Sequence, residues 1–276
     1  MNAPEPGIFH GISSEDYHRG PGFSSSGART LTSKTPAHFR HQQTHPTYSD
    51  AFDMGTAAHS VILENDYTGI LEVDAPNWLT KAAKEAKSEA RAAGLVPLLS
   101  KDLRAVEAMH ASVLAHDRAR TILQGGKAEQ SVYWHHETGT LLKARPDKFN
   151  PDSALGPLIV DLKTTISADP EKFSKSVADY GYHQQQAWYE DGLKAHGFDA
   201  KFVFVLVEKA PPYLVNVVEL DPYAVELGRF ANDKAIRLYN ECTTNDHWPG
   251  YPVAEPVHLP LWAERQAEED YEGMVA

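Results

Sequence analysis

The chain has 276 residues, of which 42% are hydrophobic and 23% are charged, and its formal net charge is −12. This length is enough for one substantial hydrophobic core, and the composition is that of an ordinary globular protein. The sequence contains no run of 18 or more apolar residues and no basic-then-apolar leader, so we expect neither a membrane span nor a signal peptide. Cys242 is the single cysteine, which excludes an intrachain disulfide and a cysteine-ligated iron–sulfur cluster and favours a reducing, cytoplasmic setting.

The first half of the chain is predicted to be mainly helical after a start rich in proline and glycine. A short helix should follow Ser24–Ser26, and small and apolar residues at helical spacing predict another over 51–63. Periodic apolar positions predict further helices over 78–93 and 100–122. The helix over 51–63 carries His59, which is either a nitrogen ligand for a metal such as Mn²⁺ or a histidine satisfied within the core.

The middle of the chain is predicted to form strands. Two β-rich runs, 128–137 and 141–149, flank Thr138-Gly139-Thr140, which predicts a hairpin with Glu129 on its first strand and Asp147 near the end of its second. The apolar run 158–162 is typical of a strand buried on both faces. Asp161 and Lys163 are two residues apart and therefore project from one face of that strand.

These charged residues admit two interpretations. A buried carboxylate and a buried ammonium are costly unless they are paired or bound to a metal. Asp147 and Asp161 could hold a hard divalent cation such as Mg²⁺, with Lys163 beside the phosphorus of a phosphodiester under attack. The alternative is an ordinary ion pair between Asp161 and Lys163, and the spacing alone does not decide between the two.

The last third of the chain alternates helices and strands. A predicted helix over 182–196 places Gln185 and Tyr189 four residues apart on one face, where an amide and a phenol can meet a phosphate or a nucleotide. Strands are predicted over 200–208 and 213–219, and a helix capped by Asp221 should follow. Together the elements predict an α/β fold with a mixed central sheet flanked by helices. We expect one domain over 1–262 and a frayed acidic tail over 263–276.

The order of these motifs resembles a known nuclease family. Gly-X-X-X-His, an acidic residue, Arg-Pro-Asp, Asp-X-Lys and Gln-X-X-X-Tyr occur in this order in the RecB-type branch of the PD-(D/E)XK nucleases. The likeness is greatest to the exodeoxyribonuclease VIII (RecE) nuclease domain of phages and prophages. It extends over about residues 8–240 and includes the stretches 24–39, 182–192 and 202–207. The resemblance implies a core like that of the restriction endonucleases.

The resemblance also implies roles for individual residues. His59, Asp147, Asp161 and the backbone carbonyl of Leu162 would hold Mg²⁺ or Mn²⁺, and Lys163 would be the catalytic lysine. Glu129 matches an acidic position near the metals, but a solvent-facing carboxylate explains it equally well. Gln185 and Tyr189 match a motif that contacts DNA near the cleaved bond. Arg145 could contact phosphates or pair with neighbouring acids.

The implied activity is metal-dependent hydrolysis of linear double-stranded DNA, as a 5′→3′ exonuclease in phage-type recombination. The implied partners are double-stranded DNA, a single-strand annealing recombinase, and further copies of the chain in a ring. Two alternatives stay open: an endonuclease or structure-specific nuclease with the same site, and a catalytically silent DNA-binding or assembly module. The negative net charge requires a local basic channel, for which the candidates are Arg29, Lys34, Arg40, Lys81, Lys84, Lys87 and Arg91.

Overall fold

A mixed five-stranded sheet forms the centre of the protein. The computed structural model describes residues 4–45, 50–252 and 256–275, and the strand order of this sheet is β11-β10-β9-β8-β5. The two long central strands run parallel, and both β8 and β11 are antiparallel to their neighbours. The predicted α/β architecture with a mixed sheet is therefore confirmed. The strands are β5 (Lys127–Ala128), β8 (Lys148–Asn150), β9 (Leu158–Thr165), β10 (Lys201–Glu208) and β11 (Val215–Val218).

A second sheet contains the predicted hairpin. Its strand order is β1-β6-β7-β2, and β6 pairs with β7 in the antiparallel sense. The predicted strand over 141–149 is wrong, because β7 ends at Ala144 and β8 then joins the five-stranded sheet. Pro146 lies at this break and has no N–H for a ladder hydrogen bond. The strands are β1 (Gly7–Phe9), β2 (Phe23–Ser24), β6 (Ser131–His135) and β7 (Leu141–Ala144).

The break changes the place of two predicted site residues. Asp147 lies where the chain crosses from one sheet to the other, and not on the hairpin strand. Glu129 also lies outside the strands, between β5 and β6, with φ of 53° in the left-handed region. Both carboxylates therefore sit on short connecting segments between the two sheets, which bring them toward β9.

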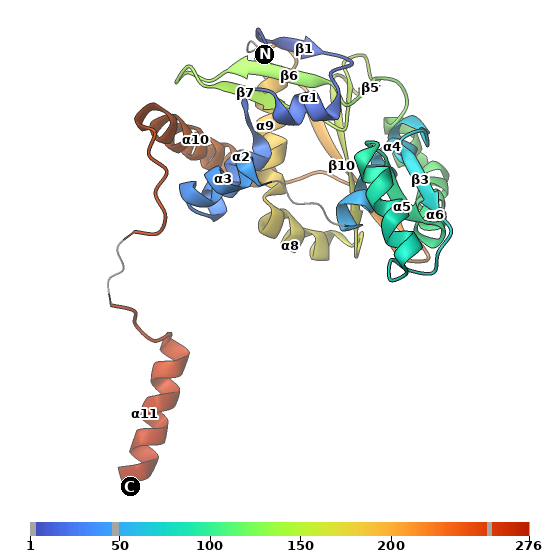
Figure 1. Ribbon diagram of the computed structural model, residues 1–276. Helices are drawn as coiled ribbons and strands as arrows, with labels where there is room; N and C mark the ends of the chain where they lie inside the picture. The colour runs from blue at the N-terminus through green and yellow to red at the C-terminus, as the bar shows by residue number, and fades with distance from the viewer. Residues whose placement is uncertain (1–3, 46–49, 253–255, 276) are drawn as a thin grey trace.

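A helical subregion covers one face of the central sheet (Figure 1). Alternate residues of β9 and β10, such as Val160, Leu162 and Val205, pack into its core. The predicted helix over 100–122 is divided at His116, whose ring accepts a hydrogen bond from Ala119 N at the start of the second helix. The elements are α4 (Asp50–Glu64), α5 (Lys81–Ala92), α6 (Ser100–Ala115), α7 (Asp117–Ile122) and the small parallel pair β3 (Ile70–Val73) and β4 (Val96–Leu99).

Helices from distant parts of the sequence cover the other face. Ile159, Phe202 and Phe204 share a core with Trp188 of α9. Gly228 allows α10 to approach α9, because a Cβ there would lie 2.3 Å from the His183 carbonyl oxygen. The helices on this side are α2 (Ser25–Ser33), α3 (Pro36–Thr44), α8 (Pro170–Tyr180), α9 (Tyr182–Lys194) and α10 (Pro222–Asn245). Helix α1 (Ser14–Arg19) lies against the second sheet, where Tyr17 packs on Tyr133 of β6.

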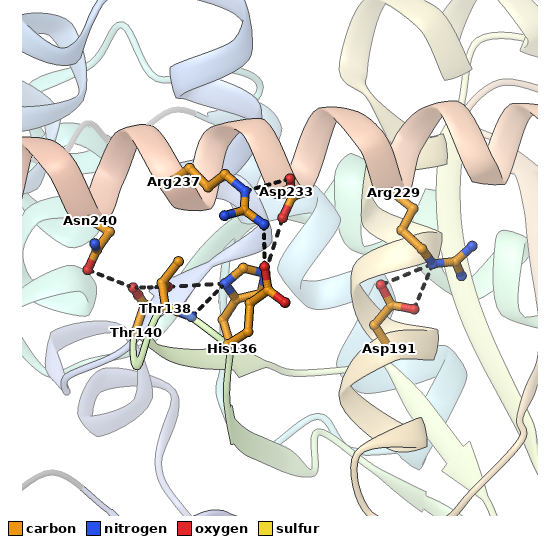
Figure 2. Close-up of polar contacts among 9 residues, drawn as sticks. His136, Thr138, Thr140, Asp191, Arg229, Asp233, Arg237 and Asn240 are labelled. Atoms are coloured by element: carbon orange, nitrogen blue, oxygen red, sulfur yellow. Dashed lines mark hydrogen bonds and ion pairs between the residues drawn. The ribbon is translucent and has the colours of Figure 1, made fainter.

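A polar cluster joins the β6–β7 turn to α10 (Figure 2). The ligand atoms of His136, Glu137 and Asp233 lie within 4.8 Å of one another. Arg237 pairs with both carboxylates of this group and already supplies a cation there. We therefore assign the cluster a structural role, that of fixing the hairpin turn against the helix that supports α9.

The acidic end of the chain is helical in the structure. Residues Leu261–Val275 form helix α11, and Figure 1 shows this helix standing apart from the rest of the protein. Fraying of the tail over 263–276 stays a prediction. The domain boundary at 262 stays a prediction. Among the described residues, none of the helices combines the length and the apolar character that a membrane crossing needs.

Candidate active site

Asp161 and Lys163 lie together on the face of β9 that α9 covers. The predicted burial of this strand on both faces is confirmed, since Leu158 to Leu162 are all buried. Asp161 is 0% exposed, its Oδ2 lies 2.5 Å from Lys163 Nζ, and its Oδ1 accepts a hydrogen bond of 2.8 Å from Gln185 Nε2. Lys163 Nζ also lies 4.7 Å from the centre of the Tyr182 ring. The period of two in β9 thus places the carboxylate and the ammonium in direct contact.

The backbone N–H and carbonyl groups of Leu162, between Asp161 and Lys163, contact Asp147 and His59. The N–H donates to Asp147 Oδ2 over 2.8 Å, and the carbonyl oxygen lies 2.8 Å from His59 Nε2. His59 Nε2 is in turn 3.4 Å from Asp147 Oδ2. The structure thus brings His59, Asp147 and the Leu162 carbonyl into contact with one another. These three groups were expected as metal ligands from the resemblance.

The buried charges of the site perturb one another. Burial raises the pKa of Asp147, and the nearby Asp161 carboxylate raises it further. Burial acts to lower the pKa of His59, but Asp147 and the Leu162 carbonyl outweigh it, so that this pKa is raised. The pKa of Lys163 is also raised, since the attraction of Asp161 and Asp147 exceeds the effect of burial. The two carboxylates thus favour the protonated forms of His59 and Lys163.

The donor set fits a hard divalent cation. Two carboxylates and a peptide carbonyl provide oxygen ligands of the kind that Mg²⁺ and Mn²⁺ accept, and an imidazole is compatible with Mn²⁺. His59 and Lys163 lie beside these carboxylates and can supply the positive charge that balances them. Asp161 contacts Gln185 and Lys163, whereas Asp147 lies beside His59. Among the described residues, the ligand atoms of His59, Asp147 and Asp161 do not form a group within 4.8 Å of one another, as those of His136, Glu137 and Asp233 do.

A cavity of about 260 Å³ lies beside Asp147. Ser24, Ser25 and Ser26 line it from the N-terminus of α2, where backbone N–H groups and the helix dipole favour an anion. Ser25 is 4% exposed and its Oγ has no hydrogen-bond partner, and Arg29 Nε is likewise buried without one. The remaining lining residues are Tyr17, His18, Glu129, Arg145 and Tyr189. The cavity is therefore suited to a phosphate next to the carboxylates.

Arg145 is held by the protein at one wall of this cavity. Its Nε lies 2.5 Å from Glu129 Oε2, and its terminal nitrogens donate to the backbone oxygens of Ile12 and Ser13. Burial raises the pKa of Glu129, and Asp147 adds to this effect. These contacts fix the guanidinium beside Glu129 rather than leaving it free to follow a phosphate. The geometry favours Arg145 as the group that orients Glu129.

Helix α9 presents a row of polar groups to the site. Gln185 Nε2 contacts both Asp161 and the hydroxyl of Tyr189, at 3.3 Å for the second contact. Burial raises the pKa of Tyr189, so its phenol remains neutral and able to donate. Sequence reasoning gave no role to Tyr182, whose ring covers Lys163. Its position three residues before Gln185 and seven before Tyr189 places it on the same helical face and could have indicated it.

Comparisons with known proteins identify the family. Residues 24–257 match the family described as a PDDEXK-like domain of unknown function (DUF3799), and the chain belongs to that family. The recognition of a PD-(D/E)XK nuclease domain from the sequence is confirmed at this level. No curated protein matches the chain.

The solved structures show the fold. A candidate exonuclease from Eubacterium rectale is 13% identical with a TM-score of 0.62, and the match covers 91% of this chain and 97% of that one. A phage-related exonuclease from Haemophilus somnus 129PT is 11% identical with a TM-score of 0.34, covering 82% and 96% respectively. The first likeness shows a shared fold over 91% of this chain, and the second is too slight to carry an argument.

Proposed function

We propose that this protein is a metal-dependent deoxyribonuclease that hydrolyses phosphodiester bonds of linear double-stranded DNA as a 5′→3′ exonuclease. The observation that carries the proposal is the contact between Asp161 and Lys163 on β9, joined through the Leu162 peptide to Asp147 and His59. An ion pair that served only the fold would not require a second buried carboxylate with a raised pKa beside it. The family supports the same chemistry.

Asp147, Asp161, His59 and the Leu162 carbonyl would hold Mg²⁺ or Mn²⁺, with Glu129 as a further acidic group at the edge of the cavity. A bound divalent cation polarises the phosphoryl oxygen and lowers the pKa of a coordinated water. Lys163 lies where it can orient the attacking water and neutralise the charge that develops on the phosphate. The water oxygen forms a bond to phosphorus and gives up a proton while one ester P–O bond breaks, and the departing oxygen takes up a proton, so that the protons balance.

The cavity beside Asp147 gives the DNA strand a second point of attachment. Its unpartnered Ser25 Oγ and Arg29 Nε can donate to the oxygens of the phosphate adjacent to the scissile one. Gln185 and Tyr189, which link Asp161 to the wall of the cavity, can contact the DNA between the two phosphates. Two neighbouring phosphates held in this way would fix the strand in line with Lys163.

Release of label from linear duplex DNA marked at either the 5′ or the 3′ end tests the proposal. Mg²⁺-dependent early loss of the 5′ label, with closed circles spared, is the expected result for the exonuclease. Cutting of closed circles would favour the endonuclease, which the same residues could serve. Binding of DNA without degradation in Mg²⁺ or Mn²⁺ would favour the catalytically silent module.

The wider biological role rests on the resemblance of the sequence to RecE-type nucleases. We propose that the enzyme acts in phage-type recombination, where its product strand passes to a single-strand annealing recombinase, and that copies of the chain close into a ring around DNA. Light scattering of the purified protein tests the ring through its mass, and a monomer at micromolar concentration would contradict it.

A further inference from the structure

An exposed aromatic ring lies at the junction of α8 and α9. Tyr180 is the last residue of α8 and is 62% exposed. Gly181 follows with φ of 65° and turns the chain directly into α9, which begins at Tyr182. The ring centres of Tyr180 and Tyr182 are 5.6 Å apart and their planes are tilted by 30°. The tight junction thus holds one ring in solvent against another ring in the protein.

Tyr182 connects the exposed ring to the candidate catalytic lysine. It stacks on the buried Phe173, with ring centres 5.7 Å apart, and its face lies 4.7 Å from Lys163 Nζ. Lys163, Tyr182 and Tyr180 therefore follow one another from the interior to the surface. Only one aromatic ring separates Tyr180 from the group that we place beside the scissile phosphate.

Arg29 connects the same junction to the phosphate-sized cavity. Its NH1 donates to the carbonyl oxygen of Tyr180 over 2.8 Å, while its side chain lines the cavity beside Asp147. Gly181 makes this placement possible, since a Cβ at that position would lie 2.9 Å from Arg29 Cδ. A guanidinium that can contact a DNA phosphate is thus fixed to the backbone of the residue that carries the exposed ring.

We infer that Tyr180 is a stacking platform for an unpaired nucleobase of the strand whose phosphates occupy the site, and the inference rests on the proposed function. A strand held between Lys163 and Arg29 carries its base within one nucleotide of Tyr180. An exposed aromatic ring binds any base through its π-face, with a gain of about 1–3 kcal/mol per base. The platform would make the enzyme prefer DNA ends whose terminal nucleotides are unpaired over fully paired ends.

The test uses the full chain and a duplex with 2-aminopurine at an unpaired terminal position, in Ca²⁺ so that the strand stays intact. Stacking on Tyr180 should quench the fluorescence of wild type and of Tyr180→Phe. Tyr180→Ala should lose the quenching and raise the Kd for this DNA at least about fivefold. Tyr271→Ala is the matched control, because Tyr271 is 70% exposed on α11, away from the site.

Hydrolysis in Mg²⁺, measured in parallel, separates this inference from the proposed function. Equal quenching and Kd for wild type and Tyr180→Ala would overturn the platform even if wild type degrades DNA. Loss of quenching in Tyr180→Ala without any hydrolysis by wild type would support the platform and contradict the nuclease. Equal losses in Tyr180→Ala and Tyr271→Ala would also overturn the inference, because the effect would not be specific to the junction.

Discussion

Gln185 donates its side-chain amide to Asp161 Oδ1 over 2.8 Å and thereby joins α9 to the central strand β9. The bond fixes one oxygen of a fully buried carboxylate, while the other oxygen remains in contact with Lys163. The orientation of Asp161 therefore depends on how α9 is seated against the sheet. Helix α10 packs on α9 and therefore influences the orientation of Asp161, although α10 is far from Asp161 in the sequence.

Replacement of either candidate metal-binding carboxylate should abolish hydrolysis. Asp161→Asn and Asp147→Asn keep the shape of the side chain but remove a charged oxygen ligand, and a loss of several kcal/mol of transition-state stabilisation lowers the rate at least about 1,000-fold. The rate of release of acid-soluble nucleotides in Mg²⁺ measures the effect, with circular dichroism as the check on folding. A folded variant that retains wild-type turnover would refute the assignment of that carboxylate.

Lys163→Gln should separate catalysis from metal uptake. The variant loses the ammonium beside the scissile phosphate, so we expect turnover to fall at least about 100-fold. Calorimetric titration with Mn²⁺ should still show binding, because Lys163 is not a ligand. The matched control is Lys101→Gln on α6, which should leave both quantities unchanged. Loss of metal uptake in Lys163→Gln would contradict a separate catalytic role.

The raised pKa of His59 predicts a pH dependence of stability. Burial lowers this pKa, but Asp147 and the Leu162 carbonyl raise it by more. A base with a raised pKa in the folded state contributes stability that is fully present below its unfolded pKa of about 6.5 and is lost as the pH rises through the folded value. In EDTA, the free energy of unfolding of wild type should therefore fall above about pH 6.5 relative to His59→Gln.

Denaturant titrations of the two proteins at several pH values measure this difference. Protonated His59 must lose a proton before it can bind a cation, so the affinity of wild type for Mn²⁺ should rise over the same pH range. A constant difference in unfolding free energy between wild type and His59→Gln across this range would show that His59 does not titrate with a raised pKa.

The seating of α9 can be tested at Gly228. Gly228→Ala places a Cβ 2.3 Å from the His183 carbonyl oxygen, so α10 must move away from α9. Overpacking of this kind costs about 1–3 kcal/mol, which a shift in the denaturation midpoint measures. Gly250→Ala is the control, since a Cβ there meets no atom within 4 Å. Equal stability of the two variants would show that the contact does not hold α9 in place.

The sequence predicted the relative positions of two side chains correctly where they lie on one strand or one helix, because the repeat of that element determines which face each side chain occupies. The spacing of two between Asp161 and Lys163 predicted their common face, and the spacing of four between Gln185 and Tyr189 predicted theirs; both pairs are in contact in the structure. The prediction of a buried strand over 158–162 is also confirmed, because a short, continuous apolar run is typical of a strand that is covered on both faces.

The predictions were wrong where a short strand could join either of two sheets. Ala144 and Lys148 belong to different sheets, and the local sequence does not indicate which neighbour each strand pairs with. Pro146 between them could have indicated the break itself, because proline cannot donate a hydrogen bond to a neighbouring strand. The cavity at α2 could not be predicted, since its lining combines residues near positions 17–29 with Glu129, Asp147 and Tyr189. That proximity is created only by the tertiary fold.

The measurement that tests the central claim most directly is the time course of nucleotide release from linear duplex DNA by wild type and Asp161→Asn. It is run in Mg²⁺, in EDTA, and in EDTA followed by excess Mg²⁺. Release by wild type that stops in EDTA, resumes on addition of Mg²⁺ and is absent throughout in Asp161→Asn is the predicted result. Release that persists in EDTA, or that Asp161→Asn retains, would contradict a metal-dependent nuclease centred on Asp161.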